Sequence, residues 1–586
     1  MQFKASVALD NGYTYMKKKT RPIDVFNLSS GGTSASALVP ATLGKDVNLA
    51  QYSTVGINKL YQGILTYDKK INNHQLNVLA GLSREESNLQ DFWTFRSNLI
   101  SYNTDVLSQG EVGTEQNNGG EIATARMNYF ANIGYNFKEK YFLQILSRYD
   151  GSYLFPKSTR YGFFPGVSAG WVISDEKFMS NGPFDFLKLR ASYGELGNDN
   201  VLANQFSTSF GSVVYVLGTE NSVYTTQTLN ELRIGNPNIT WEVAKNTDVG
   251  IEGALFNNRL SFEIDYYESD RNNILTQPYG SIADITGIVP PFQNLGRTTN
   301  KGWEYTLGYK TTVGDLNINT SAFISTNDNT LIFADEPEGL DPAVSKEGRR
   351  IGAWKYWDVI GVFQNQAQID SYPVDHSGVG VGITRPGDLI IEDVNGDGVI
   401  NTYDYKFTDG SVIPKMVSSF NLQLNYRNLD FTARLYGTFG GYIDQVHGTG
   451  LFLSKYVYDN RWTKEGDQSE FGRAIHTGNP YKGLMIAKTD HIKLQYIELG
   501  YNLDSDTLQN TFGLNAFDSA RLFVNGNDLF YKIFDDKLWS HPESFSGDFD
   551  NGYGVLEQLS PSQTLSQPGT LSFANQSISF GINLKF

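Results

Sequence analysis

The feature that most constrains the fold is an alternation of apolar and polar residues in runs as long as a membrane-crossing strand. The last ten residues read SISFGINLKF, with apolar residues at every second position from Ile578 to Phe586. Successive side chains of a β-strand point to opposite faces, so this run predicts a strand with one apolar face. The same pattern recurs at 126–137, 303–310, 419–427 and 429–439.

The strands of a soluble sandwich also alternate apolar and polar residues, but the length and number of these runs favour a barrel. The runs span about 9 to 14 residues, as a tilted membrane-crossing strand requires. Aromatic pairs such as Tyr141-Phe142 and Phe530-Tyr531 stand at strand ends, where interfacial girdles lie. About 16 such runs occur, which would be an unusual number for a sandwich. We therefore expect an all-β fold, an antiparallel transmembrane β-barrel.

The connections between these runs alternate between short and long. Residues 257–259 and 427–428 form tight turns, whereas long polar stretches fill 198–240, 274–295, 332–350 and 440–490. This asymmetry predicts short periplasmic turns and long extracellular loops. The apolar phase breaks once, in HIKLQYIELGYNL, and a β-bulge near Tyr496 would restore a single apolar face.

Composition excludes several classes of protein. The chain has 586 residues and no cysteine, so disulfides and thiolate sites are absent. A net charge of −16 argues against nucleic acid as a partner. No apolar run reaches the roughly 18 residues of a membrane-spanning helix, but a barrel carries its apolar residues at alternate positions, where hydropathy averages miss them.

Enzyme motifs are weak. The six histidines are scattered without metal-ligand spacing, and no P-loop or dinucleotide fingerprint is present. Residues 166–170 spell G-x-S-x-G, but that motif needs a strand-to-helix step and here continues into the strand-like Trp171-Val172-Ile173. We interpret the motif as strand sequence, and we do not expect an enzyme.

One loop motif predicts a metal site, in a calcium-type loop within residues 385–410. The sequence DVNGDGVINTYD matches an EF-hand loop, with oxygen ligands at positions 1, 3, 5, 7 and 12 and glycine at position 6. Position 12 is Asp rather than the usual Glu. The shorter side chain of Asp places both carboxylate oxygens on the ion less easily than Glu does. The alternative is an Asn/Asp/Gly-rich turn that binds nothing. The predicted calcium ligands are Asp393, Asn395, Asp397, Val399, Asn401 and Asp404.

Two clusters of aromatic residues are the candidate substrate-binding residues. Flat rings suit the apolar faces of sugars, and both clusters lie in predicted loop segments. Packing within the loops is the alternative, because aromatic residues are 13% of the sequence. The first cluster comprises Trp354, Tyr356 and Trp357, and the second comprises Tyr456, Tyr458 and Trp462.

Several stretches, in order, resemble the SusC/RagA-type TonB-dependent outer-membrane transporters of Bacteroidetes. They are FFPGVSAGW at 163–171, LKLRASYG at 187–194, WEVAKNTDVGIEG at 241–253, NLGRTTNKGWEYTLGYK at 294–310, IGVFQ at 360–364, RPGDLIIEDVNGDGVIN at 385–401 and RLFVNGNDLF at 521–530. The resemblance covers about residues 160–586.

This resemblance implies a 22-stranded barrel with an N-terminal plug, in the outer membrane. It also implies a SusD-like surface lipoprotein and the TonB complex as partners, beside outer-membrane lipid. With about 16 strands expected and no plug or signal peptide recognised, residues 1–586 are interpreted as one barrel domain. The plug, the first strands and the signal peptide would then be missing from it.

Three functions remain open from the sequence. The first is TonB-dependent import of a nutrient, with a glycan or oligosaccharide as the expected cargo and a peptide as the variant. The second is a passive porin-like channel, which needs no plug. The third is a non-transporting all-β carbohydrate-binding protein.

Overall fold

The computed structural model spans residues 1–586. It describes all of them except 21–22, 29–37, 44–45, 202, 220–221, 279, 282–289, 378–383, 446–454, 474–483, 485, 514–515, 539–540 and 544–575. The chain forms two compact units. The first contains residues 1–135 and 145–165, and the second contains residues 136–144 and 166–586.

The first unit is built on long antiparallel strands. β1 (Gln2–Thr20) pairs with β4 (Asn48–Ile71) along its whole length, and β4 pairs with β5 (His74–Arg96) through the tight turn at 72–73. β2 (Ile23–Leu28) and β3 (Leu38–Leu43) form a separate hairpin. The remaining elements are η1 (Leu107–Gln109) and three strands whose residues are divided between the two units: β6 (Gln116–Phe137), β7 (Tyr141–Ser152) and β8 (Tyr161–Val172).

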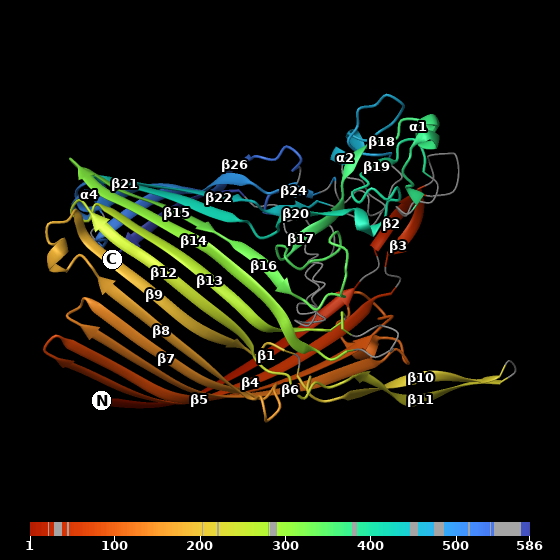
Figure 1. Ribbon diagram of the computed structural model, residues 1–586, viewed down its shortest axis with the longest axis horizontal. Coiled ribbons are helices and arrows are strands. Elements are labelled where there is room, and N and C mark those ends of the chain that lie inside the picture. Colours follow the sequence, from red (N-terminus) through yellow and green to blue (C-terminus); the bar gives the residue numbers. More distant parts are fainter. Residues whose placement is uncertain are drawn as a thin grey trace. The chain divides into compact units, whose positions relative to one another are not determined.

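The second unit is an antiparallel meander that Figure 1 shows as long neighbouring ribbons. Pairing runs from β8 through β9, β12, β13, β14, β15, β21, β22, β25 and β26 to β27. We call these strands the wall. Their bounds are β9 (Phe184–Asn198), β12 (Glu242–Leu255), β13 (Leu260–Thr276), β14 (Gln293–Val313), β15 (Leu316–Thr326), β21 (Met416–Tyr426), β22 (Leu429–Phe439), β25 (His491–Asp504), β26 (Ser519–Ile533) and β27 (Ser577–Lys585).

The connections of the second unit carry the smaller elements. A hairpin of β10 (Ser209–Thr219) and β11 (Ser222–Arg233) lies between β9 and β12 in the sequence. The others are η2 (Lys177–Met179), β16 (Asp328–Phe333), β17 (Ala353–Trp357), β18 (Val359–Val362), α1 (Gln366–Ser371), β19 (Leu389–Ile391), η5 (Thr402–Asp404), β20 (Tyr405–Ser411), β23 (Tyr442–Asp444), α2 (Lys455–Asp459), β24 (Ile486–Lys488) and α4 (Ser505–Phe512).

The number of long strands confirms the sequence estimate. Eighteen of the described strands have nine or more residues, and two of these, β10 and β11, pair with each other. Subtracting that hairpin leaves sixteen (18 − 2). The short turns are also confirmed, since β12 and β13 are joined by residues 256–259, and β21 and β22 by residues 427–428.

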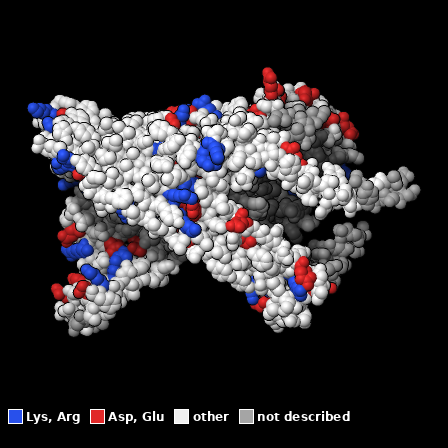
Figure 2. Space-filling view, turned by 90° about the horizontal axis from the view of Figure 1, so that it is seen from below, with Lys and Arg blue, Asp and Glu red and all other residues white. Residues whose placement is uncertain are grey.

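The wall strands have one apolar face, as the alternation predicts. On β14, every second residue from Trp303 to Tyr309 is an exposed apolar or aromatic side chain, while Glu304, Thr306 and Gly308 between them are half-buried. Figure 2 shows wide uncharged areas between scattered groups of charged side chains on the face in view. A lipid-facing barrel wall presents an exposed apolar side chain at every second residue.

The predicted bulge is present. In the pairing of β25 with β22, Arg434 lies opposite Tyr496 and Leu435 lies opposite Leu494, so Gln495 has no partner. The pairing with β26 shifts at the same point. One extra residue changes which side chains face outward, and Leu499 and Tyr501 therefore join Ile492 among the exposed apolar residues.

Among the described residues, no helix has the length and apolarity needed to cross a membrane.

Candidate functional site

The folded insertion between β16 and β21 holds most of the predicted site residues. We call it the loop module: residues 353–411, packed against residues 455–473. Two small antiparallel sheets form it, β17 with β20 and β18 with β19. Its buried core comprises Trp357, Val362, Leu389, Ile391, Ile400, Val457 and Phe471. Such a core lets a connecting segment hold a fixed shape.

The first aromatic cluster is mostly built into this module. Trp357 is 5% exposed, stacks on Tyr405 with ring centroids 4.9 Å apart, and donates from its indole nitrogen to the Asn401 carbonyl at 2.8 Å. Trp354 is 7% exposed and donates to the Tyr442 carbonyl at 3.4 Å. Tyr356 is half-buried on the same strand, β17. Both tryptophan side chains are therefore largely closed to solvent.

The second cluster is more open. Trp462 packs against the module core and donates to the Gln364 side chain at 3.2 Å. Tyr458 is 52% exposed, and the Arg461 guanidinium lies 3.6 Å from its ring centroid. Tyr456 belongs to α2, but its side chain lies outside the described part of the chain. Of the predicted binding aromatics with described side chains, Tyr458 is the most exposed residue.

The calcium-type loop is held by its own side chains. The Asp393 carboxylate accepts from the backbone N–H groups of Gly396 at 2.8 Å and Gly398 at 2.9 Å. Both glycines have positive φ, at 73° and 83°, a region that other residues enter only with strain. Asn395 and Asp397 each accept a hydrogen bond from the backbone N–H two residues later. The loop is thus a compact turn with oxygen-bearing side chains at alternate positions.

The predicted ligand at position 12 of the loop already accepts backbone hydrogen bonds. Asp404 is fully buried, and its carboxylate accepts from the N–H groups of Val394 at 2.9 Å and Asn401 at 2.8 Å. The Asn401 side chain in turn accepts from Tyr403 N–H, which completes a capping box on η5. In the described residues no group of three His, Cys, Asp or Glu side chains lies close enough to hold a metal ion.

The loop is fixed to the module core on one side. Ile400, next to the predicted ligand Val399, is fully buried in that core. On β20, Lys406 lies 2.8 Å from Asp358 and also pairs with Glu392, and these two carboxylates raise the pKa of Lys406. The loop therefore keeps its shape through a core residue and its internal hydrogen bonds.

The inner face of the wall carries ion pairs that reach across a whole strand. Arg190 on β9 and Asp265 on β13 lie on either side of Gly250 on β12, each in register with it. The guanidinium lies 2.6 Å from the Asp265 carboxylate and also pairs with Glu263. A Cβ at Gly250 would overlap that carboxylate and lie 2.7 Å from Arg190 Nε. Glycine leaves the space in which the two charges meet.

A second arrangement of this kind lies on the last wall strands. Arg521 on β26 reaches over Gly500 on β25 to Asp430 on β22, with Nε 3.0 Å from the carboxylate, and it also lies 2.7 Å from Glu498. A Cβ at Gly500 would lie 2.5 Å from the guanidinium. Neither arrangement is visible in the sequence, because the paired side chains are 75 and 91 residues apart and meet only through the register of the strand between them.

A charged cluster also forms where β25 meets the chain after β26. Lys493 is 7% exposed, and its ammonium lies 2.7 Å from Glu543 and 3.0 Å from Asp528. Tyr531 donates to the Glu543 carboxylate at 3.1 Å, and His491 Nε2 lies 3.7 Å from it. The His491 imidazole and the Lys493 ammonium hold the pKa of Glu543 at about 2, below its usual 4.5.

This depressed pKa predicts a loss of stability in acid. The ionised Glu543 stabilises the fold above pH 4.5, and this contribution disappears as the pH falls toward 2. At pH 7 we expect the free energy of unfolding of Glu543→Gln to be about 2 kcal/mol lower than that of the wild type. This value allows for the partial exposure of the Glu543 side chain. The difference should shrink below pH 4 in urea unfolding of both proteins. A difference that does not change with pH would contradict this assignment.

Comparison with known proteins gives the family. The family model described as "TonB dependent receptor-like, beta-barrel" matches residues 2–366. TonB-dependent receptor P26 of Formosa agariphila is 28% identical over 93% of this chain and 54% of its own length. TonB-dependent receptor SusC of Bacteroides thetaiotaomicron is 25% identical over 65% of this chain and 38% of its own length. The chain spans about half the length, or less, of these curated relatives.

Solved structures support the same fold. The RagAB peptide importer in the "open-open" state superposes with a TM-score of 0.74 at 18% identity, covering 100% of this chain and 59% of that one. Another structure of the RagAB peptide transporter gives 0.71 at 19% identity, over 92% and 57% of the two chains. These relatives are named as receptors and transporters. The chain belongs to the TonB-dependent receptor β-barrel family, is of the SusC/RagA type, and is a protein of the outer membrane.

Proposed function

We propose that this chain forms the wall of a TonB-coupled importer. The observation that carries the proposal is a wall with an apolar outer face and an ion-paired inner face, in a chain of this receptor family. A polar interior suits passage of a hydrophilic cargo, and an apolar exterior suits lipid. The named relatives are receptors rather than enzymes, which supports a function in transport without catalysis.

The proposed partners follow from the family. A SusD-like surface lipoprotein would act on the extracellular side, together with the long connections and the loop module, and the TonB complex would supply energy from the periplasm. The proposed cargo is a glycan or oligosaccharide, with an exposed aromatic side chain at Tyr458 in support. Peptide is the variant, supported by the fold shared with the RagAB peptide importer.

Uptake by whole cells tests this function. We expect cells that express the complete protein to accumulate labelled oligosaccharides, or labelled peptides, faster than deletion cells. Collapse of the proton-motive force should remove that difference, because TonB coupling needs energy. Uptake that persists after the collapse would instead support a passive porin-like channel. Supplying the two cargo classes separately decides between glycan and peptide.

We propose, in addition, that the calcium-type loop binds Ca²⁺ and stabilises the loop module. The oxygen-bearing side chains of Asp393, Asn395 and Asp397 stand at the spacing that this ion uses. Asp404 is fully buried, whereas Asn395, Asp397 and Val399 are exposed, so we expect the ion to rely on the first three side chains, the Val399 carbonyl and water. The ion would have a structural role on the extracellular side.

Calcium should therefore protect the module from protease. At a concentration a hundredfold above its dissociation constant, a ligand of the folded state adds about 2.7 kcal/mol. We expect Ca²⁺ to lengthen the protease half-life of the wild-type module, and Asp393→Asn with Asp397→Asn to abolish that effect. Asp370→Asn, in α1, is the control and should keep the response. Equal half-lives with and without Ca²⁺ in the wild type would show that the turn binds no ion.

A further inference from the structure

The loop module joins the wall through two chain segments, 350–353 and 411–415, which we call the neck. Ala353 pairs with Ser411 where the β17–β20 sheet begins. On the wall side, the Asn327 N–H donates to the Lys415 carbonyl at 2.7 Å, just after β15 stops pairing with β21. A side chain that reaches Asn327 and the outgoing segment together would join the wall to both sides of the neck.

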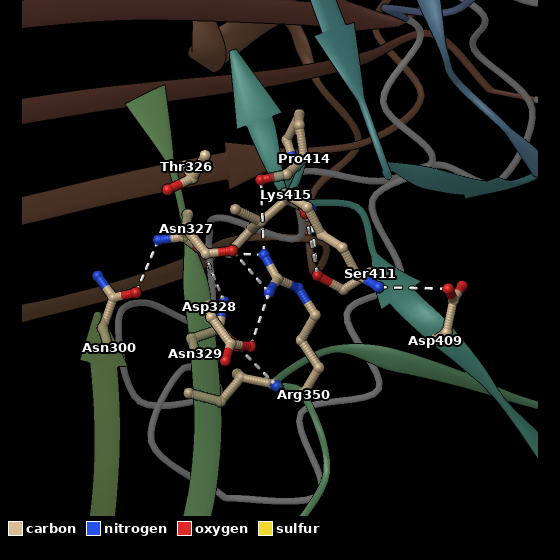
Figure 3. Close-up of polar contacts among 12 residues, drawn as sticks. Asn300, Thr326, Asn327, Asp328, Asn329, Arg350, Asp409, Ser411, Pro414 and Lys415 are labelled. Carbon is tan, nitrogen blue, oxygen red and sulfur yellow. Dashed lines mark hydrogen bonds and ion pairs between the residues drawn. The ribbon is translucent and has the colours of Figure 1, made fainter. Parts of the chain in front are cut away.

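Arg350 has that position (Figure 3). One of its terminal nitrogens, Nη1, donates to the Asn327 carbonyl at 2.9 Å, and the other, Nη2, donates to the Asn327 side-chain oxygen at 2.8 Å. Nη2 also lies 3.5 Å from the Pro414 carbonyl in the outgoing segment. A single guanidinium on the incoming segment thus contacts both the wall and the outgoing segment.

The environment of Arg350 is unusual for a cation. Its side chain is 6% exposed, and its one ion-pair partner among the described residues is Asp328, 3.6 Å away and 66% exposed. The other acceptors are neutral, and Nε has no hydrogen-bond partner in the described structure. Burying a charge is costly unless the geometry around it is good. The planar fork of arginine supplies that geometry, whereas lysine places a single nitrogen.

The acceptor of the guanidinium is itself fixed to the wall. The Asn327 amide donates to the Asn300 side chain on β14 at 2.7 Å. Asn329 donates to the Asn327 side-chain oxygen at 3.2 Å and accepts from the Ile351 N–H at 2.8 Å. Three asparagines therefore connect Arg350 to the wall through side-chain hydrogen bonds, next to the point where β16 begins.

We propose that Arg350 is a clasp, a positioning residue that fixes how the loop module stands on the wall. The module has a separate hydrophobic core, and Arg350 is not part of that core. Loss of the clasp should therefore loosen the neck and leave the module folded. This inference goes beyond the importer function, since it holds for any cargo and does not depend on TonB.

Hydrogen exchange of the complete protein in lipid vesicles tests the clasp. In Arg350→Lys we expect the amides of Ile351 and Ala353 in the neck, and of Asn327 beside it, to exchange at least tenfold faster than in the wild type, because their hydrogen bonds open more often. The amides of Ile391 and Ile400, in the module core, should keep their wild-type rates.

Two further variants keep the test sharp. Arg349→Lys is the matched control, since the Arg349 side chain donates to the Ser345 and Pro342 carbonyls and lies over the Phe407 ring, away from Asn327. It should leave the neck rates unchanged. Asn327→Ala removes the side-chain acceptor of the guanidinium and keeps the backbone carbonyl, so it should accelerate exchange at the neck by less than Arg350→Lys does. The double variant should exchange little faster than Arg350→Lys alone.

Two outcomes would overturn the proposal. Wild-type exchange at the neck in Arg350→Lys would show that the guanidinium holds nothing there. Equal acceleration of neck and core amides would show that Arg350 stabilises the module as a whole rather than its attachment to the wall.

Discussion

Replacing Gly250 by alanine is expected to lower the free energy of unfolding by about 3 kcal/mol. The new methyl group would occupy the space in which Arg190 meets Asp265, so the ion pair would separate. The Asp265 side chain is 8% exposed, and it would keep its charge with a weaker partner. Removing the partner of a buried charge costs more than losing a surface ion pair.

Urea unfolding in lipid vesicles measures this effect. Gly194→Ala is the control, because glycine is again replaced on a neighbouring wall strand, and the nearest atom to the added Cβ lies 3.9 Å away. We expect the control to stay within about 0.5 kcal/mol of the wild type. Equal stability of the Gly250→Ala and Gly194→Ala proteins would show that the strand-crossing ion pair contributes little.

Replacing Trp357 by alanine is expected to destabilise the loop module by about 3–5 kcal/mol. The substitution would empty a buried site in the module core and remove the hydrogen bond to the Asn401 carbonyl. The wall has its own strand pairing, so the loss should appear as local opening of the module. The protease half-lives of the module and of the wall, each followed through its own fragments, measure this local opening.

Tyr458→Ala is the contrasting variant, because that ring is exposed and outside the core. It should leave the half-life of the module unchanged, and cargo binding by this variant then reports on the ring itself. If Trp357→Ala leaves the module as resistant as the wild type, the tryptophan is not a core residue. Its aromatic ring would then have to be reconsidered as a binding surface.

The wall was predictable because its signal is local. Apolar residues two apart must face the same side of a strand, so the run from Trp303 to Tyr309 identifies a lipid-facing face without knowledge of its neighbours. The same rule located the bulge in β25, since a one-residue insertion reverses the phase. Short polar turns such as 427–428 are likewise visible in the sequence alone.

The interior and the loop module were less predictable, because their contacts join residues far apart in sequence. Nothing near Gly250 indicates that Arg190 and Asp265 meet across it, 75 residues apart. Trp354 and Trp357 were predicted as binding residues from their type. The structure buries both of them, Trp357 in a core that includes Phe471 from a distant part of the sequence. The clasp at Arg350 depends equally on two distant segments, which contribute the Asn327 and Pro414 acceptors.

A single-cysteine scan along β14 tests whether the wall strands face lipid on alternate residues. The protein has no native cysteine, so each introduced label reports one position. We expect a lipid-confined quencher to act on labels at the apolar positions, which are Trp303, Tyr305, Leu307 and Tyr309. Labels at Glu304, Thr306 and Lys310 should respond instead to a water-soluble quencher. Quenching without a period of two, or water access at every position, would show that β14 does not face lipid on alternate residues.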